Sequence, residues 1–319
     1  DHYIEVPFDL SQVLFITTAN SLDTVSRPLL DRMEIIELSG YTSNEKFHIA
    51  KDYLVKKSMK NNGLDDNDLT ISDDAIEAVI EYYTREAGVR KLEQQIGKIC
   101  RKAVKKLLEN TERPIEVTKQ NLEEYLGKER FHFEKMNEQD EIGVARGLAW
   151  TSVGGDTLSI EVNVMPGSGK VELTGKLGDV MKESAMAAIS YIRANSQKLG
   201  IAENFHKTKD IHIHVPEGAV PKDGPSAGIT MATAVVSALT KNPVRNDIAM
   251  TGEITLRGRV LPIGGLKEKS LAAFRAGITD IIIPNENKAD IDDVPKEVRS
   301  KINFIPVKSM DTVLENALR

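Results

Sequence analysis

With 319 residues, the chain is longer than a single compact core usually holds, which favours two domains. Its 40% of hydrophobic and 28% of charged residues exclude an intrinsically disordered protein, and its one cysteine, Cys100, excludes a disulfide framework and favours a reducing, cytoplasmic compartment. The formal charge of −6 argues against a protein that binds nucleic acid through its overall charge, and no apolar run is long enough to predict a membrane span.

Charge is distributed unevenly along the chain. Residues 1–140 carry a net charge of −7, whereas residues 141–319 carry a net charge of +1. The change falls in the polar stretch 134–141, which we interpret as a linker between domains. Ahead of the linker, the apolar runs 13–16 and 33–38 predict buried or half-buried strands.

A run of helices is predicted next. Ser43 is expected to cap a helix that stops before Gly63, and Ser72, followed by two aspartates, marks a second helix start. Apolar residues recur at intervals of three and four over 89–109, which predicts an amphipathic helix with one buried face. Thr118 is expected to cap a last short helix. Together these segments predict an acidic helical bundle.

The residues after the linker mix strands and helices without strict alternation, which predicts an α+β or irregular α/β domain. The expected strands and helices follow in chain order: strands at 145–151, 158–164, 171–174 and 211–215, an extended segment at 248–256, and strands at 280–284 and 302–307, with helices at 179–199, 226–239, 266–276 and 310–318.

The segment Lys222-Asp-Gly-Pro-Ser-Ala-Gly228 carries the strongest local signal for chemistry. Its proline and glycines predict a turn that places Ser226 at the start of an apolar, buried helix. Ser226 is then either an ordinary N-cap or the nucleophile of an acyl transfer, because free N–H groups at a helix start can bind a developing oxyanion. The turn does not match the Gly-x-Ser-x-Gly elbow.

A nucleophilic serine needs a base, and lysine supplies the better candidates. His212 and His214 share one face of a predicted strand, but no third ligand is spaced to complete a metal site, so we interpret them as structural and expect no metal. In the helix after Gly265, Lys269 falls in a sector of small apolar residues, where burial would lower its pKa toward the range of a general base. Lys267 is not excluded by this helical-wheel argument.

Two tempting patterns are rejected. Pro166-Gly-Ser-Gly-Lys170 lacks the first glycine and the final Ser/Thr of a phosphate-binding loop, and a strand follows it. Asp65-Asp-Asn-Asp68 lacks the glycine and glutamate of a calcium loop.

Three blocks resemble the signature blocks of the Lon proteases, which are ATP-dependent serine proteases of the AAA+ class. They are Pro221-Lys-Asp-Gly-Pro-Ser-Ala-Gly228, Met250-Thr-Gly-Glu-Ile-Thr-Leu-Arg-Gly258 and Leu261-Pro-Ile-Gly-Gly-Leu-Lys-Glu-Lys269, and the resemblance extends over essentially the whole chain. It implies a Ser–Lys dyad, with Ser226 as nucleophile and Lys269 as general base. It also implies that Thr251 helps to hold the lysine and that Asp223 acts in gating or in holding the loop.

The N-terminal half resembles the end of the Lon ATPase module. This resemblance implies that Asn20 belongs to the sensor-1 strand, that Arg32 is the arginine finger and that Arg90 is the sensor-2 contact with nucleotide. The implied domains are a remnant of the AAA+ core at 1–39, a helical small subdomain at 40–133, the linker at 134–141 and a mixed α/β peptidase domain at 142–319.

One departure from the family pattern is large, because no phosphate-binding loop and no apolar run ending in paired acids occurs in these residues. These elements would lie before Asp1, so we expect peptide hydrolysis without a cofactor and no ATP hydrolysis, although the family uses ATP and Mg²⁺. The implied substrates are unfolded proteins or peptides, and the implied assembly is a homohexamer. The alternative is a non-catalytic module that binds a partner or nucleic acid through the basic residues Arg101, Lys102, Lys105 and Lys106, which the charge of residues 1–140 disfavours.

Overall fold

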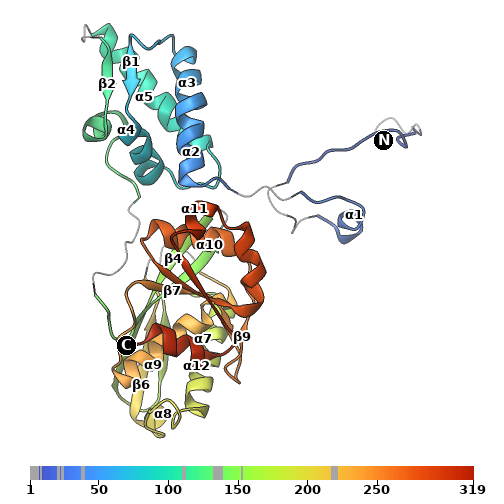
Figure 1. The fold of residues 1–319 in the computed structure, drawn as a ribbon, viewed down its shortest axis with the longest axis vertical. Coiled ribbons are helices and arrows are strands. Elements are labelled where there is room, and N and C mark those ends of the chain that lie inside the picture. Colours follow the sequence, from blue (N-terminus) through green and yellow to red (C-terminus); the bar gives the residue numbers. More distant parts are fainter. Residues whose placement is uncertain are drawn as a thin grey trace. The chain divides into compact units, whose positions relative to one another are not determined.

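The structure, a computed structural model, describes residues 7, 9–19, 22, 25–36, 40–109, 113–131, 139–151, 154–216 and 222–319. The chain divides between Ser39 and Gly40 into two compact units (Figure 1). In the described part of the first unit, the regular element is the short helix α1 (Arg27–Leu30).

The predicted strand at 13–16 is wrong in this structure. These residues form no strand, and Leu14 and Ile16 are each 84% exposed. Residues 33–36 of the second predicted strand form none either, and residues 37–38 lie outside the described part of the chain. A strand is stable only when it is paired within a sheet, and no described segment of this unit pairs with either run.

A helical bundle opens the second unit. It contains α2 (Ser43–Ile49), a π-helical turn (Ala50–Leu54), α3 (Val55–Asn61), β1 (Leu69–Ile71), α4 (Asp73–Ala78), a second π-helical turn (Val79–Tyr83), α5 (Arg90–Leu108), β2 (Ile115–Val117) and α6 (Leu122–Leu126), with β1 and β2 pairing in parallel. The amphipathic helix predicted over 89–109 is confirmed as α5, whose face with Leu92, Ile96, Ile99 and Ala103 is buried in the bundle core.

Helix starts in the bundle follow the capping signals, with one correction. Thr42, not Ser43, is the N-cap of α2: its hydroxyl accepts the Glu45 N–H, and the Glu45 carboxylate accepts the Thr42 N–H. Thr118 is the N-cap of the 3₁₀ turn Lys119–Asn121 that leads into α6, as expected, and its N–H donates to the Asn121 side-chain oxygen at 2.9 Å.

A seven-stranded mixed sheet forms the centre of the remaining residues, in the order β11-β10-β7-β3-β4-β6-β5. Its strands are β3 (Val144–Thr151), β4 (Gly154–Pro166), β5 (Val171–Thr174), β6 (Lys209–His214), β7 (Ile248–Met250), β10 (Asp280–Pro284) and β11 (Asn303–Val307). The pairs β3–β4 and β4–β6 are antiparallel, and the other four pairs are parallel. A separate hairpin joins β8 (Glu253–Ile254) to β9 (Val260–Leu261).

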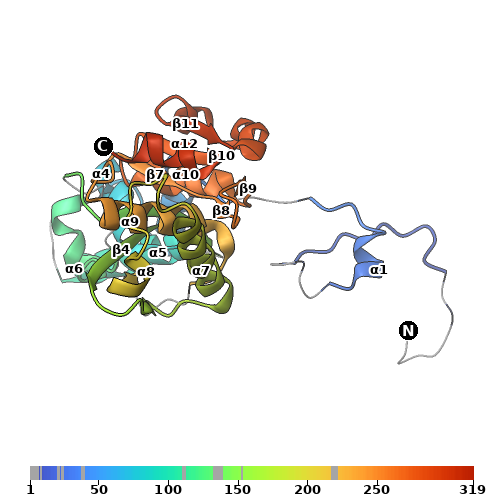
Figure 2. The same cartoon turned by 90° about the horizontal axis from the view of Figure 1, so that it is seen from below.

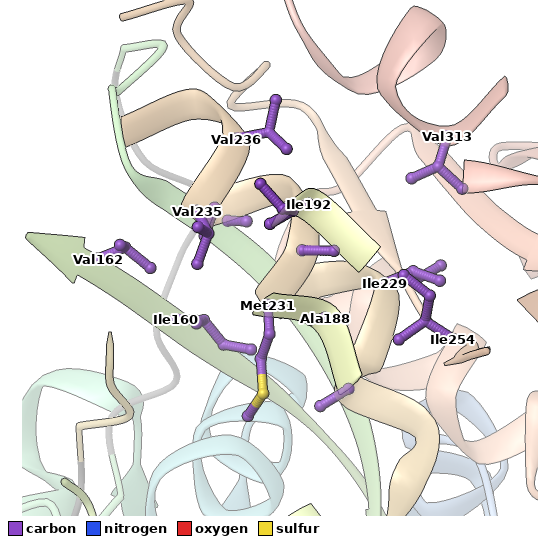
Figure 3. Packing of buried hydrophobic residues seen from close by; sticks show 14 of the residues in the cluster. Ile160, Val162, Ala188, Ile192, Ile229, Met231, Val235, Val236, Ile254 and Val313 are labelled. Atoms are coloured by element: carbon purple, nitrogen blue, oxygen red, sulfur yellow. The ribbon is translucent and has the colours of Figure 1, made fainter. Parts of the chain in front are cut away.

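Helices cover both faces of this sheet. They are α7 (Asp179–Ala194), α8 (Phe205–Thr208), α9 (Gly228–Thr240), α10 (Leu266–Arg275), α11 (Lys296–Arg299) and α12 (Met310–Ala317). Figure 2 shows α7 and α9 side by side. Figure 3 shows the apolar contacts of α7 and α9 with β4, including Ile160, Met231 and Ile192.

Successive side chains along each strand point to opposite faces of the sheet and so belong to different hydrophobic cores. In β10, Ile282 belongs to the core shared with α7, α9 and α12, whereas Ile281 and Ile283 belong to the core shared with α10. The observed fold is therefore a mixed α/β arrangement in which α9 and α10 lie on opposite faces of the sheet, near the end of β7. No helix in the described ranges has the length and apolar character that a membrane crossing requires.

Candidate active site

Ser226 lies in a single 3₁₀ turn, Pro225–Ala227, immediately before α9. Gly224 precedes this turn with φ +130° and ψ 154°, a backbone conformation that side chains with a Cβ rarely adopt. The Ser226 carbonyl accepts the Gly252 N–H at 2.8 Å, and the Gly252 carbonyl accepts the Ile229 N–H at 3.2 Å. These two bonds attach the start of α9 to the chain just after β7 and leave Ser226 half-buried.

The loop before Ser226 is held by α7. One carboxylate oxygen of Asp223 accepts the Met181 N–H at 3.0 Å, in the first turn of α7, and the Gly224 N–H at 2.9 Å. The Ser184 hydroxyl, one turn further along α7, donates to the Pro225 carbonyl at 3.2 Å. Asp223 itself is exposed, so its observed contacts are those of a loop anchor.

Lys269 projects from α10 into a buried position and is 3% exposed. Its ammonium donates to the Thr251 hydroxyl at 3.0 Å, and burial lowers the pKa of Lys269 to about 8, because the apolar surroundings disfavour the charged form. Thr251, which follows β7 directly, is fully buried. Lys267 is only half-buried, so the structure separates the two lysines that the helical wheel left open.

Thr251 connects the lysine to the serine. Its hydroxyl accepts from Lys269 and lies 3.5 Å from the Ser226 carbonyl oxygen, to which it donates. Among the described residues, the Ser226 hydroxyl and the Lys269 ammonium share no direct hydrogen bond. The arrangement therefore combines a serine at a helix start, a buried lysine of lowered pKa, and a buried threonine hydroxyl that bonds both the lysine ammonium and the serine's backbone carbonyl. A serine and a lysine of lowered pKa are groups that can perform acyl transfer.

The two strand histidines have a structural partner. The Thr174 hydroxyl on β5 is hydrogen-bonded to His212 Nε2 at 2.8 Å and to His214 Nδ1 at 2.6 Å on β6. Across the described ranges, no group of three or more His, Cys, Asp or Glu side chains is arranged to hold a metal ion.

The residues expected to contact nucleotide fall in different parts of the chain, and each is described by itself. Asn20 lies outside the described residues. Arg32 is exposed and follows α1 in the first unit, whereas Arg90 begins α5 in the second. Arg90 lines a cleft of about 610 Å³ in the bundle, together with Ser58, Asn61, Asn62, Glu93, Gln94, Gly97 and Arg101.

The basic residues late in α5 are largely engaged within the bundle. The Lys102 ammonium donates to the Glu124 carbonyl at 3.0 Å, the Lys106 ammonium forms an ion pair with the Glu124 carboxylate at 2.6 Å, and Lys105 lies 3.8 Å from Glu109. Two of the four basic residues thus have acidic partners, which reduces the positive charge of this patch.

Two contacts of the site were missed from the sequence. Neither Ser184 nor Gly252 was assigned a role, because their interactions join segments that are 41 and 26 residues apart and carry no local pattern. One signal could have pointed to Ser184: it lies about one turn after Met181, on the same face of the helix α7.

Comparisons with known proteins agree over the whole chain. A model of the Lon protease (S16) C-terminal proteolytic domain matches residues 116–319, and a model of the Lon protease AAA+ ATPase lid domain matches residues 60–115. The Lon protease of Clostridioides difficile (strain 630) is 60% identical over 319 residues, which cover 100% of this chain and 40% of the relative. Lon protease 1 of Bacillus subtilis (strain 168) is 59% identical over 318 residues, with 100% and 41% covered. The chain spans about two fifths of the length of the curated relatives it matches.

Proposed function

Because the chain belongs to the Lon protease family and carries its proteolytic and lid domains, we propose that it is an endopeptidase in which Ser226 is the nucleophile and Lys269 the general base. The observation that carries the proposal is the burial of Lys269. A lysine with a pKa of about 8 is neutral in an appreciable fraction of molecules near neutral pH, and only the neutral amine can accept a proton.

The proposed reaction proceeds in two halves. Lys269 Nζ takes the proton from Ser226 Oγ as this oxygen bonds to the carbonyl carbon of the substrate, and the proton then passes to the leaving amine as the C–N bond breaks. Water next attacks the acyl-enzyme while Lys269 takes one of its protons. The C–Oγ bond breaks, and Ser226 recovers its proton. N–H groups at the start of α9 bind the oxyanion in both halves.

Thr251 and Asp223 support this chemistry in different ways. The Thr251 hydroxyl holds the lysine nitrogen in place and joins it to the Ser226 turn. Asp223 holds the loop before Ser226 against α7 and takes no part in proton transfer. These different roles follow from the hydrogen-bond partners, because Asp223 bonds to backbone N–H groups while Thr251 bonds to the proposed base itself.

The domain organisation is proposed as a remnant of an AAA+ core at 1–39, a helical subdomain at 40–133, a linker at 134–141 and a peptidase domain at 142–319. The residues present fit only part of a nucleotide site: Arg90 in its polar cleft can meet a phosphate, and Asn20 and Arg32 are proposed contacts. No phosphate-binding loop and no acid pair for Mg²⁺ occur in this sequence, so no step of the proposed reaction uses ATP.

The proposed substrates are unfolded polypeptides, and a homohexamer is the proposed assembly of the family member that carries this sequence. We expect an unstructured protein to be a better substrate than a compact one.

Cleavage of casein without ATP tests the proposal directly. The parent chain should cut casein, and Ser226→Ala and Lys269→Ala should each lose at least 10³-fold in rate, on the order of the loss caused by removing a residue of a catalytic unit. Lys267→Ala, two positions away on the same helix, is the matched control and should stay active. An active Lys269→Ala with an inactive Lys267→Ala would show that the base is assigned wrongly.

A further inference from the structure

Two donors converge on the carbonyl oxygen of Pro225, the residue before the proposed nucleophile. The Ser184 hydroxyl reaches it from α7 at 3.2 Å, and the Gly228 N–H reaches it from the end of the 3₁₀ turn. Ser184 is 7% exposed, so its hydroxyl has little competition from water for this bond. The direction of the Pro225 carbonyl is therefore determined by α7 as well as by the turn itself.

The direction of this carbonyl also determines that of the Ser226 N–H. A trans peptide group is planar, and its C=O and N–H point in opposite directions across the C–N bond. Because the Pro225 carbonyl faces Ser184, the Ser226 N–H faces away from α7. No described residue accepts a hydrogen bond from this N–H, as is usual for the first N–H groups of a helix, and Ser226 is half-buried.

Close packing keeps Ser184 at this position. A Cβ added to residue 228 would lie 2.8 Å from the Ser184 Oγ and 2.9 Å from the Ile254 N, so α7 reaches the turn only because residue 228 is glycine. The contact of Ser184 with the turn is consequently close and partly buried, with Ser184 itself buried and Pro225 exposed.

We propose that Ser184 is a positioning residue for peptide hydrolysis, because its hydroxyl orients the Pro225–Ser226 peptide group so that the Ser226 N–H faces the reacting carbonyl as an oxyanion donor. The inference rests on the proposed role of Ser226 and adds a specific donor and the residue that aims it. A donor aimed at the oxyanion stabilises the transition state more than the bound substrate.

The test compares Ser184→Ala with Ser184→Thr, which keeps the hydroxyl, and with Ser190→Ala as a matched control. Ser190 lies on the same helix, and its exposed hydroxyl donates to the Met186 carbonyl of that helix. The 319-residue chain is assayed on a fluorogenic peptide, with kcat expressed per active site titrated by a fluorophosphonate. The dissociation constant of a peptidyl boronic acid, whose adduct on Ser226 places an oxygen at the oxyanion position, is measured separately by fluorescence.

For Ser184→Ala, kcat should fall about three- to tenfold, as expected for one neutral hydrogen bond, with KM unchanged. Boronate affinity should fall by the same factor, and the midpoint of the acid limb of the pH profile should stay in place. Ser184→Thr should restore most of both values, and Ser190→Ala should match the parent. The boronate measurement needs no turnover, so it tests the effect of Ser184 on the oxyanion position even where peptide cleavage is slow.

Three results would overturn the inference while leaving the proposed function intact: unchanged kcat and boronate affinity in Ser184→Ala, a rise in KM alone, or a displaced acid limb, which would show that Ser184 acts through Lys269. A parent chain whose Ser226 does not react with the fluorophosphonate would instead overturn the proposed function, and the inference with it.

Discussion

Lys269 and Lys267 differ in the surroundings of their ammonium groups. Lys269 is buried and, within the described ranges, has one hydrogen-bond partner, the Thr251 hydroxyl, whereas Lys267 is half-buried. A buried ammonium without a carboxylate beside it is costly, and the cost lowers its pKa. The same burial that makes this lysine unfavourable for stability makes it suitable as a base.

The pH dependence of kcat should follow the ionisation of Lys269. Because the neutral amine is the active form, kcat should rise with pH through a midpoint near 8, the value to which burial lowers the pKa of Lys269. Single-turnover cleavage of an ester and of an amide substrate between pH 6 and 10 measures this limb. A midpoint near 6.5, the ordinary pKa of histidine, would indicate another base.

The pH dependence of the free energy of unfolding tests the pKa of Lys269 independently. The folded pKa of Lys269 lies below its unfolded value of about 10.4, so the unfolded chain binds more protons between these two pH values. Stability of the parent should therefore rise with pH from about 8 to about 10 relative to Lys269→Met. A flat difference between the two proteins over this window would contradict the burial argument.

The loop between β4 and β5 shows how an element can resemble a functional motif and serve the fold. Its backbone N–H groups at Ser168, Gly169 and Lys170 all donate to one carboxylate oxygen of Asp210, at 2.8–2.9 Å. Successive N–H groups that point to one spot form an anion site, and here the anion belongs to the chain itself. The rejection of a phosphate-binding loop from the sequence thus has a structural counterpart, because a side chain fills the place of the phosphate.

Asp210 should stabilise the protein in a pH-dependent way. Hydrogen bonds from the N–H groups of Lys170 and Ser168 lower the pKa of Asp210 below its ordinary value. For a carboxyl group with a lowered folded pKa, the stabilisation is complete above the unfolded pKa of about 3.9 and is lost as the pH falls through the folded pKa. The Tm of Asp210→Asn should therefore lie below that of the parent at pH 6, and the gap should close below pH 4. Equal Tm values at pH 6 would show that the loop does not need the charge.

Three hydrophobic cores organise the described residues of 40–319. One lies in the helical bundle and includes Ile96, a second lies between the large sheet and α7, α9 and α12 and includes Ile160, and a third lies between the sheet and α10. The first two have their own fully buried side chains, so each can lose stability without direct loss of packing in the other.

Replacing one buried isoleucine by alanine should lower local stability only in the core that contains it. Ile96→Ala and Ile160→Ala should each cost about 2–5 kcal/mol through lost burial and a residual cavity. Hydrogen exchange should then accelerate in α5 for Ile96→Ala and in β3 and β4 for Ile160→Ala. Equal acceleration in both regions by either variant would show that the two cores unfold as one unit.

Local patterns predicted the elements that depend on neighbours in sequence. The periodicity of α5, the capping at Thr118 and the strands β5 and β10 follow from residues that lie within a few positions of one another. The strand predicted at 13–16 failed because strand formation needs a partner, which apolar character alone does not supply. The cap of α2 lies at Thr42, one residue before the predicted Ser43. Serine is the better cap by residue type, but Thr42 is three residues before Glu45 and forms a capping box with it.

Sequence by itself determined the family, the mixed α/β class and the candidate serine, together with two candidate lysines, because these depend on residue types and their spacing in the chain. The family resemblance selected Lys269 from the two lysines. Only the tertiary structure showed that Lys269 is buried and Lys267 half-buried, that Thr251 bonds both the Lys269 ammonium and the Ser226 carbonyl, and that Ser184 reaches the Pro225 carbonyl. Burial and hydrogen bonding between distant segments arise when α7, α9 and α10 pack on a common sheet, and that packing depends on contacts which no local stretch of sequence contains.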